Sequence, residues 1–314
     1  MEIFRKQTTI DFMGKRRLAV IVSGILILLS IGSLVARGLN FGLDFTGGTL
    51  IEVSYSEAPE LNTVRQGLAA AGFDDAVVQT FGEPTDIVVR LAPRDEDENA
   101  DELSEDVLTA LQGTGTDVDL RRQEFVGPQI GRELAEKGGL AMLFVLLGIL
   151  IYVSVRFQWR FSLGAVCALV HDVMITFGII SVLQISFDLT VVAALLAVIG
   201  YSLNDTIVVF DRIRENFRLL RKAGSEQVIN TSVNQTLSRT LMTSGTTLLV
   251  LVALFYFGGE IIHAFAFTLI IGVLVGTYSS IYVASTAALS LGVSREDLLE
   301  RKVEKEGAHL DALP

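Results

Sequence analysis

Asp205 is a charged residue inside an apolar stretch, where an ionised side chain is unfavourable. The stretch is Val191–Phe210, VVAALLAVIGYSLNDTIVVF, which is long enough to cross a bilayer. A carboxylate near the middle of a spanning helix costs about 2.5–3.5 kcal/mol on insertion scales, so it needs a partner or a proton. Because such residues usually serve a function, we treat Asp205 as the main candidate for a functional residue.

Arg239 is the candidate partner of this carboxylate. Asp205 lies about six residues, or roughly 9 Å, from the helix end marked by Asp211. Arg239 lies at a comparable depth in the next apolar stretch, which starts from the same face. An ion pair between the two is therefore feasible. The alternative is that the arginine extends to the lipid headgroups and neutralises nothing.

His171 and Asp172 form a second polar pair, near the middle of the third apolar stretch. Histidine titrates near neutral pH and a desolvated carboxylate shifts toward it, so the pair can pass a proton. Alternatively, the two side chains hold helices together through hydrogen bonds. The same two readings, wet path or helix contact, apply to the polar residues of the fourth and fifth stretches: Tyr201, Ser202, Asn204, Thr206, Thr243, Ser244, Thr246 and Thr247.

The elements that position these residues are six predicted membrane helices. Half of the residues are hydrophobic, the mean hydropathy is +0.51, and each apolar run is of the order of the 20 residues that a span needs. The predicted helices are Leu18–Ala36, Gly139–Val155, Phe161–Leu183, Leu189–Phe210, Leu237–Phe257 and Ile262–Leu291. The last is long enough for an overhang or a break near Gly272 or Gly276, whose GxxxG spacing indicates close packing.

Basic residues indicate the orientation of the predicted helices. They flank the first helix on its N-terminal side and fill the second-to-third and fourth-to-fifth loops, whereas the loops at 184–188 and 258–260 have none. Both termini are therefore predicted to be cytoplasmic, with Arg301 and Lys302 in the tail. Lys15–Arg17 before an apolar core resembles a signal peptide, but the core is too long, so we expect a retained anchor.

Residues 38–137 break the hydrophobic pattern and are predicted to form a periplasmic domain. They contain 21 Asp and Glu residues against 7 Lys and Arg residues, so the acidity of the chain belongs to this segment. Its periodicity predicts strand, helix, two strands, helix and strand, which is typical of a ferredoxin-like α+β fold. These elements are Thr49–Tyr55, Glu60–Ala71, Ala76–Phe81, Asp86–Leu91, Asp101–Leu111 and Asp117–Val126, with a charged loop at Arg94–Asn99.

The predicted fold class is therefore a polytopic α-helical membrane protein with an α+β ectodomain between its first two helices. Residues 1–37 hold the cytoplasmic N-terminus and first helix, and residues 138–291 hold the remaining helices. Residues 211–236 are expected to be an amphipathic cytoplasmic loop that lies along the inner membrane surface. Residues 292–314 are the predicted cytoplasmic tail.

Several classes of function find no support in the sequence. The single Cys167 excludes an intrachain disulfide and cysteine-based redox chemistry. We find no HExxH, no GxSxG and no Walker-type glycine loop. The expectation is therefore a non-enzymatic protein with no cofactor, no metal and no nucleic-acid partner. Gly47-Gly48 is interpreted as a tight turn into a strand.

Five segments give the chain a specific resemblance to a known family. They are GLDFTGGT from Gly42, VGPQIG from Val126, RFQWR from Arg156, His171-Asp172, and IGYSLNDTIVVFDRIREN from Ile199. Together they resemble the SecF branch of the SecD/SecF family of bacterial protein-export subunits, which is similar in design to half of a resistance-nodulation-division transporter. The match runs in order along the whole chain.

The resemblance implies a function and partners that composition alone does not. It implies an inner-membrane subunit that pairs with SecD, joins SecYEG and YajC, and uses the proton motive force to draw the translocating preprotein outward. The proton-coupling carboxylate of the family falls on Asp205, and its essential arginine falls on Arg239. Two alternatives remain: a scaffold that only stabilises the channel complex, and a half-size exporter of small molecules.

Overall fold

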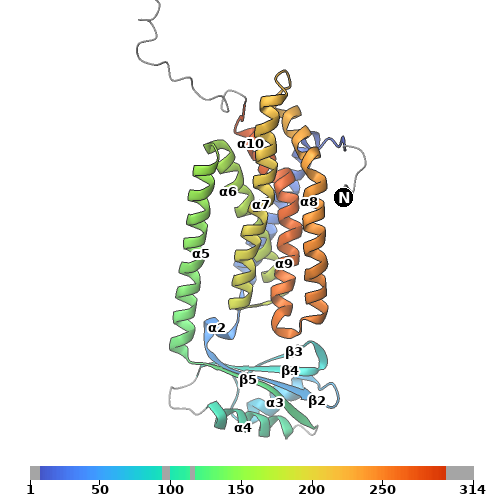
Figure 1. The fold of residues 1–314 in the computed structure, drawn as a ribbon. Helices are drawn as coiled ribbons and strands as arrows, with labels where there is room; N and C mark the ends of the chain where they lie inside the picture. The colour runs from blue at the N-terminus through green and yellow to red at the C-terminus, as the bar shows by residue number, and fades with distance from the viewer. Residues whose placement is uncertain (1–7, 94–99, 114–116, 295–314) are drawn as a thin grey trace, which may run out of the picture.

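The structure, a computed structural model, describes residues 8–93, 100–113 and 117–294. A helical bundle stands on a small α+β domain, as Figure 1 shows. The charged loop expected at Arg94–Asn99 and the tail residues Arg301 and Lys302 lie outside the described residues.

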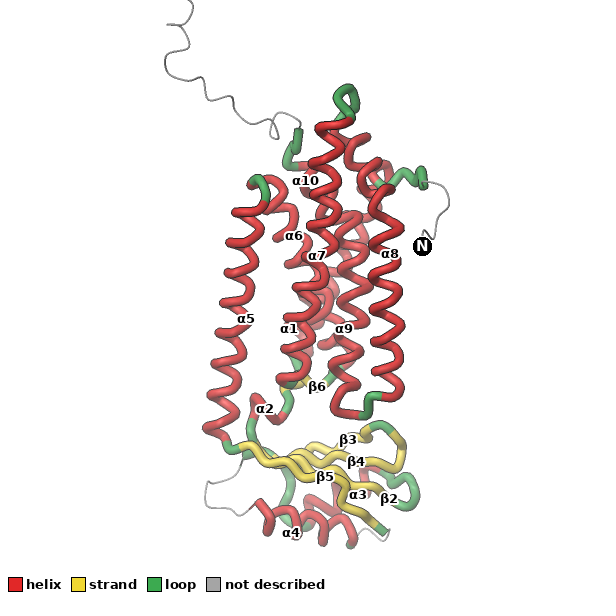
Figure 2. The backbone as a smooth tube through the Cα atoms, viewed as in Figure 1, coloured by secondary structure: helices red, strands yellow, loops and turns green. Residues whose placement is uncertain are grey.

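Six helical segments of the described chain are long and apolar enough to span a membrane, as predicted. Their elements are α1 (Arg16–Arg37), α5 (Pro128–Arg156), α6 (Trp159–Leu183), α7 (Leu189–Leu219), α8 (Ser225–Phe257), and α9 (Glu260–Ser279) with its continuation. A short 3-10 turn, η1 (Met13–Lys15), precedes α1. Helices α6 and α7 are the most buried, while α5 stands at the edge of the bundle in Figures 1 and 2.

Three helix boundaries differ from the prediction. Helix α5 begins at Pro128, well before Gly139, because a proline at the first helical position favours a helix start even in a polar sequence. Residues 211–236 do not form a loop along the membrane surface. They are the end of α7 and the start of α8, joined by a short turn, because Arg212, Asn216 and Ser232 bond across the two helices.

The last span is irregular, but not at the glycines that the sequence suggested. Helix α9 ends at Ser279 and continues through a π-helical turn, η2 (Ser280–Ala284), into α10 (Ser285–Ser290). Gly272 and Gly276 instead lie against α7: a Cβ atom would be 2.0 Å from Val198 Cγ2 at the first and 3.0 Å from Ser202 Cβ at the second. The close packing that the GxxxG spacing predicted is therefore formed between α9 and α7.

The α+β domain contains a four-stranded sheet with two helices on one face. The sheet order is β3 (Val77–Phe81), β4 (Glu83–Leu91), β2 (Gly48–Tyr55), β5 (Val118–Val126), and all neighbours are antiparallel. Helices α3 (Leu61–Ala70) and α4 (Ala100–Gln112) cover the face away from the bundle in Figure 2. This arrangement is compatible with the expected ferredoxin-like unit.

Alternation along the strands decides which face of this sheet is buried. Ile51, Val53 and Val89 point to the helices and pack against Val64 and Val107. The opposite face turns toward the bundle and carries Glu52, Arg90 and Arg122, among others. The sheet therefore presents a polar surface to the ends of the membrane helices.

Small elements connect the two parts. Strand β1 (Asn40–Phe41) pairs in parallel with β6 (Ser186–Phe187) from the α6–α7 connection, and α2 (Leu43–Thr46) precedes β2. Gly47 and Gly48 then turn the chain with φ of +67° and +113°, as the tight-turn interpretation requires. A Cβ atom on Gly48 would be 2.2 Å from the carbonyl oxygen of Leu91, so this position also needs the absence of a side chain.

Candidate functional site

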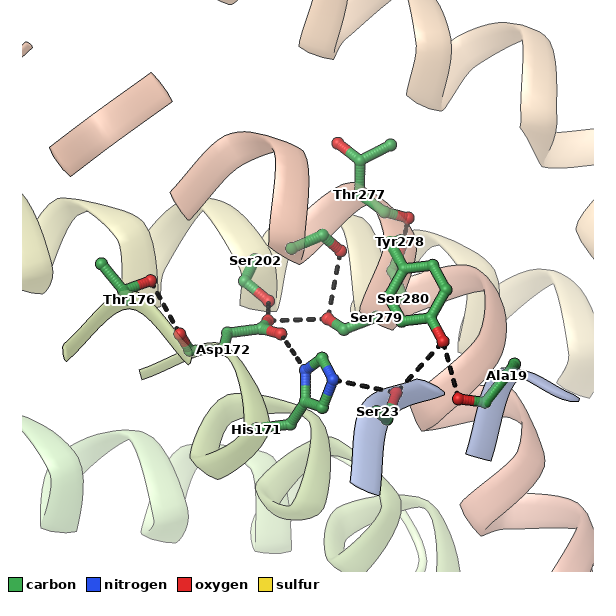
Figure 3. Close-up of polar contacts among 11 residues, drawn as sticks. Ala19, Ser23, His171, Asp172, Thr176, Ser202, Thr277, Tyr278, Ser279 and Ser280 are labelled. Carbon is green, nitrogen blue, oxygen red and sulfur yellow. Dashed lines mark hydrogen bonds and ion pairs between the residues drawn. The ribbon is translucent and has the colours of Figure 1, made fainter. Parts of the chain in front are cut away.

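His171 and Asp172 lie at the centre of a buried hydrogen-bond network, shown in Figure 3. Their side chains are 2% and 1% exposed, and Nδ1 of His171 is 2.8 Å from Oδ1 of Asp172. Oδ2 of Asp172 accepts hydrogen bonds from the hydroxyls of Ser202 on α7 and Ser279 on α9, the latter at 2.7 Å. A single carboxylate thus joins α6, α7 and α9.

The network reaches α1 through the other ring nitrogen. Nε2 of His171 is 3.0 Å from Oγ of Ser23, which is 3.1 Å from the hydroxyl of Tyr278. The Tyr278 hydroxyl donates to the carbonyl oxygen of Ala19 at 2.9 Å. Four helices of the bundle, α1, α6, α7 and α9, therefore meet at the pair.

Close helix packing makes these contacts possible. Ser23 and Ser30 are buried on the face of α1 that meets α6. A Cβ atom on Gly178 would lie 2.1 Å from Oγ of Ser30, so only glycine lets the two helices approach this closely. Small side chains at helix interfaces allow backbones to approach and short hydroxyls to reach across.

Asp205 is buried on α7 but does not belong to this network. Its side chain is 3% exposed, and its Oδ2 has no hydrogen-bond partner. Thr240 on α8 is 1% exposed, and its Oγ1 has no partner either. The two residues lie at the same level, because Tyr201 and Ser244, one turn away on each antiparallel helix, are joined by a hydrogen bond of 3.2 Å.

The predicted ion pair between Asp205 and Arg239 is not formed in the described structure. The charge of Arg239 acts on Asp205 through space, but its side chain lies on the exposed surface of the bundle. Arg239 occupies the α8 position next to the buried Thr240, and it is exposed. Asn204 is likewise exposed and stands apart from both Asp205's buried face and the His171 network.

The other polar residues of the fourth and fifth stretches divide between helix contacts and bonds within one helix. Ser244 bonds to Tyr201 and also to Thr277 on α9, at 2.7 Å, which links three helices. Three threonines of α8 instead donate to carbonyls of their own helix: Thr243, Thr246 and Thr247. Such bonds satisfy a hydroxyl inside the membrane without joining two helices.

Four residues of the site were not found by sequence reasoning: Ser23, Thr240, Tyr278 and Ser279. Serine and threonine occur throughout the apolar stretches, so their type carries no signal of function. Among these four residues, only Ser279 lies next to an irregular backbone segment, because it immediately precedes the π-helical turn. Turns of this kind are frequent at functional sites, but they are not visible in a sequence pattern.

A second polar region lies where the ectodomain meets the bundle. Arg90 of β4 donates to the carbonyl oxygen of Phe41 at 3.0 Å and to Oγ of Ser186 at 3.2 Å. Burial lowers the pKa of the Arg90 guanidinium, and the nearby Asp188 carboxylate acts in the opposite direction. Asp188 also caps α7, because its Oδ1 accepts from the backbone N–H of Val191 at 2.9 Å.

Arg90, Ser186 and Asp188 line a cavity of about 300 Å³ between the sheet and the helix ends. Asp44 also lines this cavity, and its Oδ2 accepts a hydrogen bond from the backbone N–H of Leu189 at 2.9 Å. The ectodomain is thus attached to the start of α7, the helix that carries Asp205. Within the described residues, no group of three metal-binding side chains is present here or elsewhere.

Comparisons with known proteins agree with this architecture. Residues 106–294 match the family model "Protein export membrane protein SecD/SecF, C-terminal", and residues 32–59 match the "SecD/SecF GG Motif". Protein translocase subunit SecF of Vibrio alginolyticus is 54% identical over 314 residues, covering 100% of this chain and 99% of the relative. The Pseudomonas aeruginosa SecF is 52% identical over 293 residues, covering 93% and 94%.

The solved structures extend the likeness to three dimensions. The crystal structure of SecDF, a translocon-associated membrane protein from Thermus thermophilus, superposes with a TM-score of 0.83 at 38% identity. The likeness covers 92% of this chain but 39% of that SecDF chain, which is therefore much longer. SecDF in its super-membrane-facing form gives a TM-score of 0.68 over the same fractions. On the combined sequence and structural likeness, the chain belongs to the SecD/SecF family of protein-export membrane proteins.

Proposed function

We propose that this chain is an auxiliary subunit of the Sec protein-export machinery. It works with SecD and uses the proton motive force to promote the translocation and release of secreted polypeptides. The full-length likeness to SecF proteins supports the assignment to protein export rather than to small-molecule export. Because the chain corresponds to 39% of a SecDF chain, we expect a SecD subunit to supply the rest, with SecYEG and YajC as further partners.

The buried carboxylate of Asp205 is the observation that carries the proton-coupling part of the proposal. It is 3% exposed, it has an oxygen without a partner, and it lies inside a spanning helix. Such a group needs a proton or a compensating charge. Arg239 lies on the surface of the bundle, and its charge acts on Asp205 from there. A partner subunit would cover this part of the surface.

The proposed cycle follows from that placement. A proton from the periplasmic side neutralises Asp205, removes its attraction to Arg239 and allows α7 and α8 to rearrange. Release of the proton to the cytoplasm restores the charge. One elementary charge crossing 100 mV supplies about 2.3 kcal/mol, which shifts a two-state equilibrium by about fifty-fold. Asp44 bonds to the start of α7, and Asp188, which caps that helix, interacts electrostatically with Arg90 of the sheet. The rearrangement therefore moves the domain that faces the emerging polypeptide.

The orientation is part of the proposal. Basic residues cluster at the bundle end opposite the ectodomain, at the α5–α6 and α7–α8 turns: Arg156, Arg160, Arg212, Arg214, Arg218, Arg221 and Lys222. Positive charge favours the cytoplasmic side. We therefore place both termini in the cytoplasm and the α+β domain in the periplasm, with the bundle in the bacterial inner membrane.

The test is proton-gradient-dependent release of a secreted protein into vesicles that contain this chain, its SecD partner and the channel. We compare wild type with Asp205→Asn at matched complex levels, and use Asp211→Asn as the control, since it makes the same chemical change at an exposed position. The proposal expects Asp205→Asn to lose the gradient effect with assembly intact, and Asp211→Asn to keep it. Full gradient-dependent release by Asp205→Asn would contradict the coupling role, and lost assembly would favour the scaffold.

A further inference from the structure

The donor and acceptor of each hydrogen bond from Ala19 to His171 can be assigned, because the last atom of this chain of bonds, the carbonyl oxygen of Ala19, can only accept. The carbonyl oxygen of Ala19 has no proton, so Tyr278 donates to it. A tyrosine hydroxyl has one proton, so Tyr278 must accept from Ser23. Ser23 also has one hydroxyl proton and has now used it. Nε2 of His171 therefore donates to Oγ of Ser23.

This assignment fixes the proton count of the His171–Asp172 pair. With Nε2 protonated, the 2.8 Å contact between Nδ1 and Oδ1 needs one more proton between the two atoms. The proton is either on the ring, which gives an imidazolium and a carboxylate, or on the acid, which gives two neutral groups. In both cases the pair as a whole is neutral and holds two protons, one on Nε2 and one between Nδ1 and Oδ1; loss of either leaves a net charge of −1. A neutral pair suits a site that is 2% and 1% exposed inside a membrane bundle.

We propose that His171 and Asp172 form a second proton-binding site, whose occupancy is coupled to the hydrogen bond between Ser23 on α1 and Tyr278 on α9. When the proton leaves from Nε2 to water, the shared proton stays on Nδ1 and bonds to the Asp172 carboxylate. Nε2 is then a bare acceptor facing Ser23. Ser23 turns its hydroxyl proton to the ring and gives up its bond to Tyr278.

The Nε2 side of the pair adjoins a cavity. Ser23 and His171 line a cavity of about 520 Å³ between α1, α6 and the α9–α10 region, which also contacts Cys167, Tyr282 and Thr286. Oδ2 of Asp172, in contrast, is held by Ser202 and Ser279 on the opposite side of the pair. Proton exchange is therefore expected at Nε2, and the carboxylate holds the ring in place.

Few other titratable groups of the described residues lie near the pair. Tyr278 and Tyr282 face it from α9 and η2, and the Tyr278 ring is tilted by 30° to the imidazole ring, with 6.0 Å between the ring centroids. Cys167 is one turn away on α6. On α7, Asp205 is three residues beyond Ser202 and has no bond to the pair; α1 contributes Ser23 and no charged residue at this level. The proposal does not depend on the proposed role of Asp205.

Linkage makes the coupling measurable through the histidine itself. If proton binding strengthens the Ser23–Tyr278 bond, that bond must strengthen proton binding by the same factor. Removing the Tyr278 hydroxyl frees Ser23 to donate to Nε2. We therefore expect Tyr278→Phe to lower the proton affinity of the pair by about two- to tenfold, the value of one hydrogen bond.

The experiment uses the full chain in lipid nanodiscs with His263→Gln and His309→Gln, so that ¹⁵N-labelled His171 is the only histidine. Nitrogen NMR across pH 5–9 reports which ring nitrogen carries a proton. Wild type is expected to show a protonated Nε2 at neutral pH. Tyr278→Phe should show deprotonation of Nε2 at lower pH than wild type. Asp172→Asn, whose amide donates to Nδ1, should keep Nε2 protonated at every pH.

Matched controls separate this site from general loosening and from Asp205. Ser33→Ala removes another α1–α6 hydrogen bond, 2.9 Å between Ser33 and Ser181, and should leave the His171 signals unchanged. Asp205→Asn should also leave them unchanged, whatever it does to export. An unprotonated Nε2 in wild type at neutral pH would overturn the proposal. So would a Tyr278→Phe titration identical to wild type, or an equal shift in Ser33→Ala.

Discussion

Asp205 on α7 and Thr240 on α8 lie at the same level of two antiparallel helices, and each has a buried oxygen without a hydrogen-bond partner. One turn away, Tyr201 and Ser244 at the same interface are paired and linked onward to Thr277. At the α7–α8 interface, the polar side chains of Tyr201 and Ser244 are therefore hydrogen-bonded, whereas those of Asp205 and Thr240, one helical turn away, each have an oxygen without a partner. An unsatisfied buried group costs free energy, so its retention marks a place where a proton or a water is expected to act.

Thr240→Val tests whether this hydroxyl is unpaired in the resting state. Valine has nearly the same shape, so the change removes the cost of the unpartnered hydroxyl and should raise the unfolding midpoint. Ser244→Ala is the comparison, since it removes two hydrogen bonds between helices and should lower stability by about 0.6 kcal/mol or more. Thermal unfolding in detergent measures both, and a loss of stability in Thr240→Val would show that the hydroxyl has a partner.

Ser202 and Ser279 should stabilise the bundle together in a non-additive way. Both donate to Oδ2 of Asp172, so either single change to alanine leaves the carboxylate oxygen one donor. The double variant leaves Oδ2 buried with none, and we expect a coupling energy of about 0.5–3 kcal/mol. A double-mutant cycle from reversible unfolding in mixed micelles gives this value. Strict additivity would mean that the two hydroxyls do not share the acceptor.

Asp188→Asn should loosen the ectodomain without damaging α7. Asparagine caps helices as well as aspartate does, so the bond to Val191 N–H is kept. The charge that opposes the desolvation of Arg90 is lost, and the buried guanidinium becomes more costly. We expect faster hydrogen exchange in β4 and the α6–α7 connection. Asp188→Ala, which also removes the cap, should extend the faster exchange into the first turn of α7.

The pH dependence of that junction follows from the direction of the Arg90 shift. A cation with a folded pKa below its unfolded value binds its proton less tightly when folded, so its burial costs stability at any pH where the guanidinium is charged. The cost is relieved only above the folded pKa. Once the exchange rates are corrected for the intrinsic pH dependence of amide exchange, the protection of β4 is therefore expected to be flat between pH 5 and 9 in wild type, whereas a transition in this range would implicate another group.

Gly48→Ala should disrupt the ectodomain sheet. Gly48 has a φ of +113°, and a Cβ atom would be 2.2 Å from the carbonyl oxygen of Leu91. Backbone strain of this kind costs about 1–3 kcal/mol before the clash is counted. Gly127→Ala is the control, because a Cβ atom on Gly127 would meet nothing within 4 Å. Limited proteolysis of the full chain should cut the domain of Gly48→Ala faster than that of Gly127→Ala, and equal rates would contradict the close approach.

Much of the architecture could be read from periodicity. Six apolar stretches predicted six spans, and the alternating segments of residues 38–137 predicted the strands and helices of the ectodomain, because burial imposes a period of 2 on strands and of 3.6 on helices. The boundaries were predicted less well where polar residues continue a helix beyond the membrane. Helix α5 begins at Pro128 and α7 continues to Leu219, since helical hydrogen bonding does not require an apolar sequence.

Sequence alone identifies the ionisable residues that lie inside apolar, membrane-spanning stretches: Asp205 and the His171–Asp172 pair. The residues that they contact are known only from the fold. Ser23 and Ser279 reach the pair from 148 and 107 residues away in the chain, whereas Arg239, at the expected depth, is exposed and forms no ion pair with Asp205 in the described structure. Depth along a helix follows from counting residues, whereas the facing residue depends on the rotation and packing of two helices, which no local pattern records.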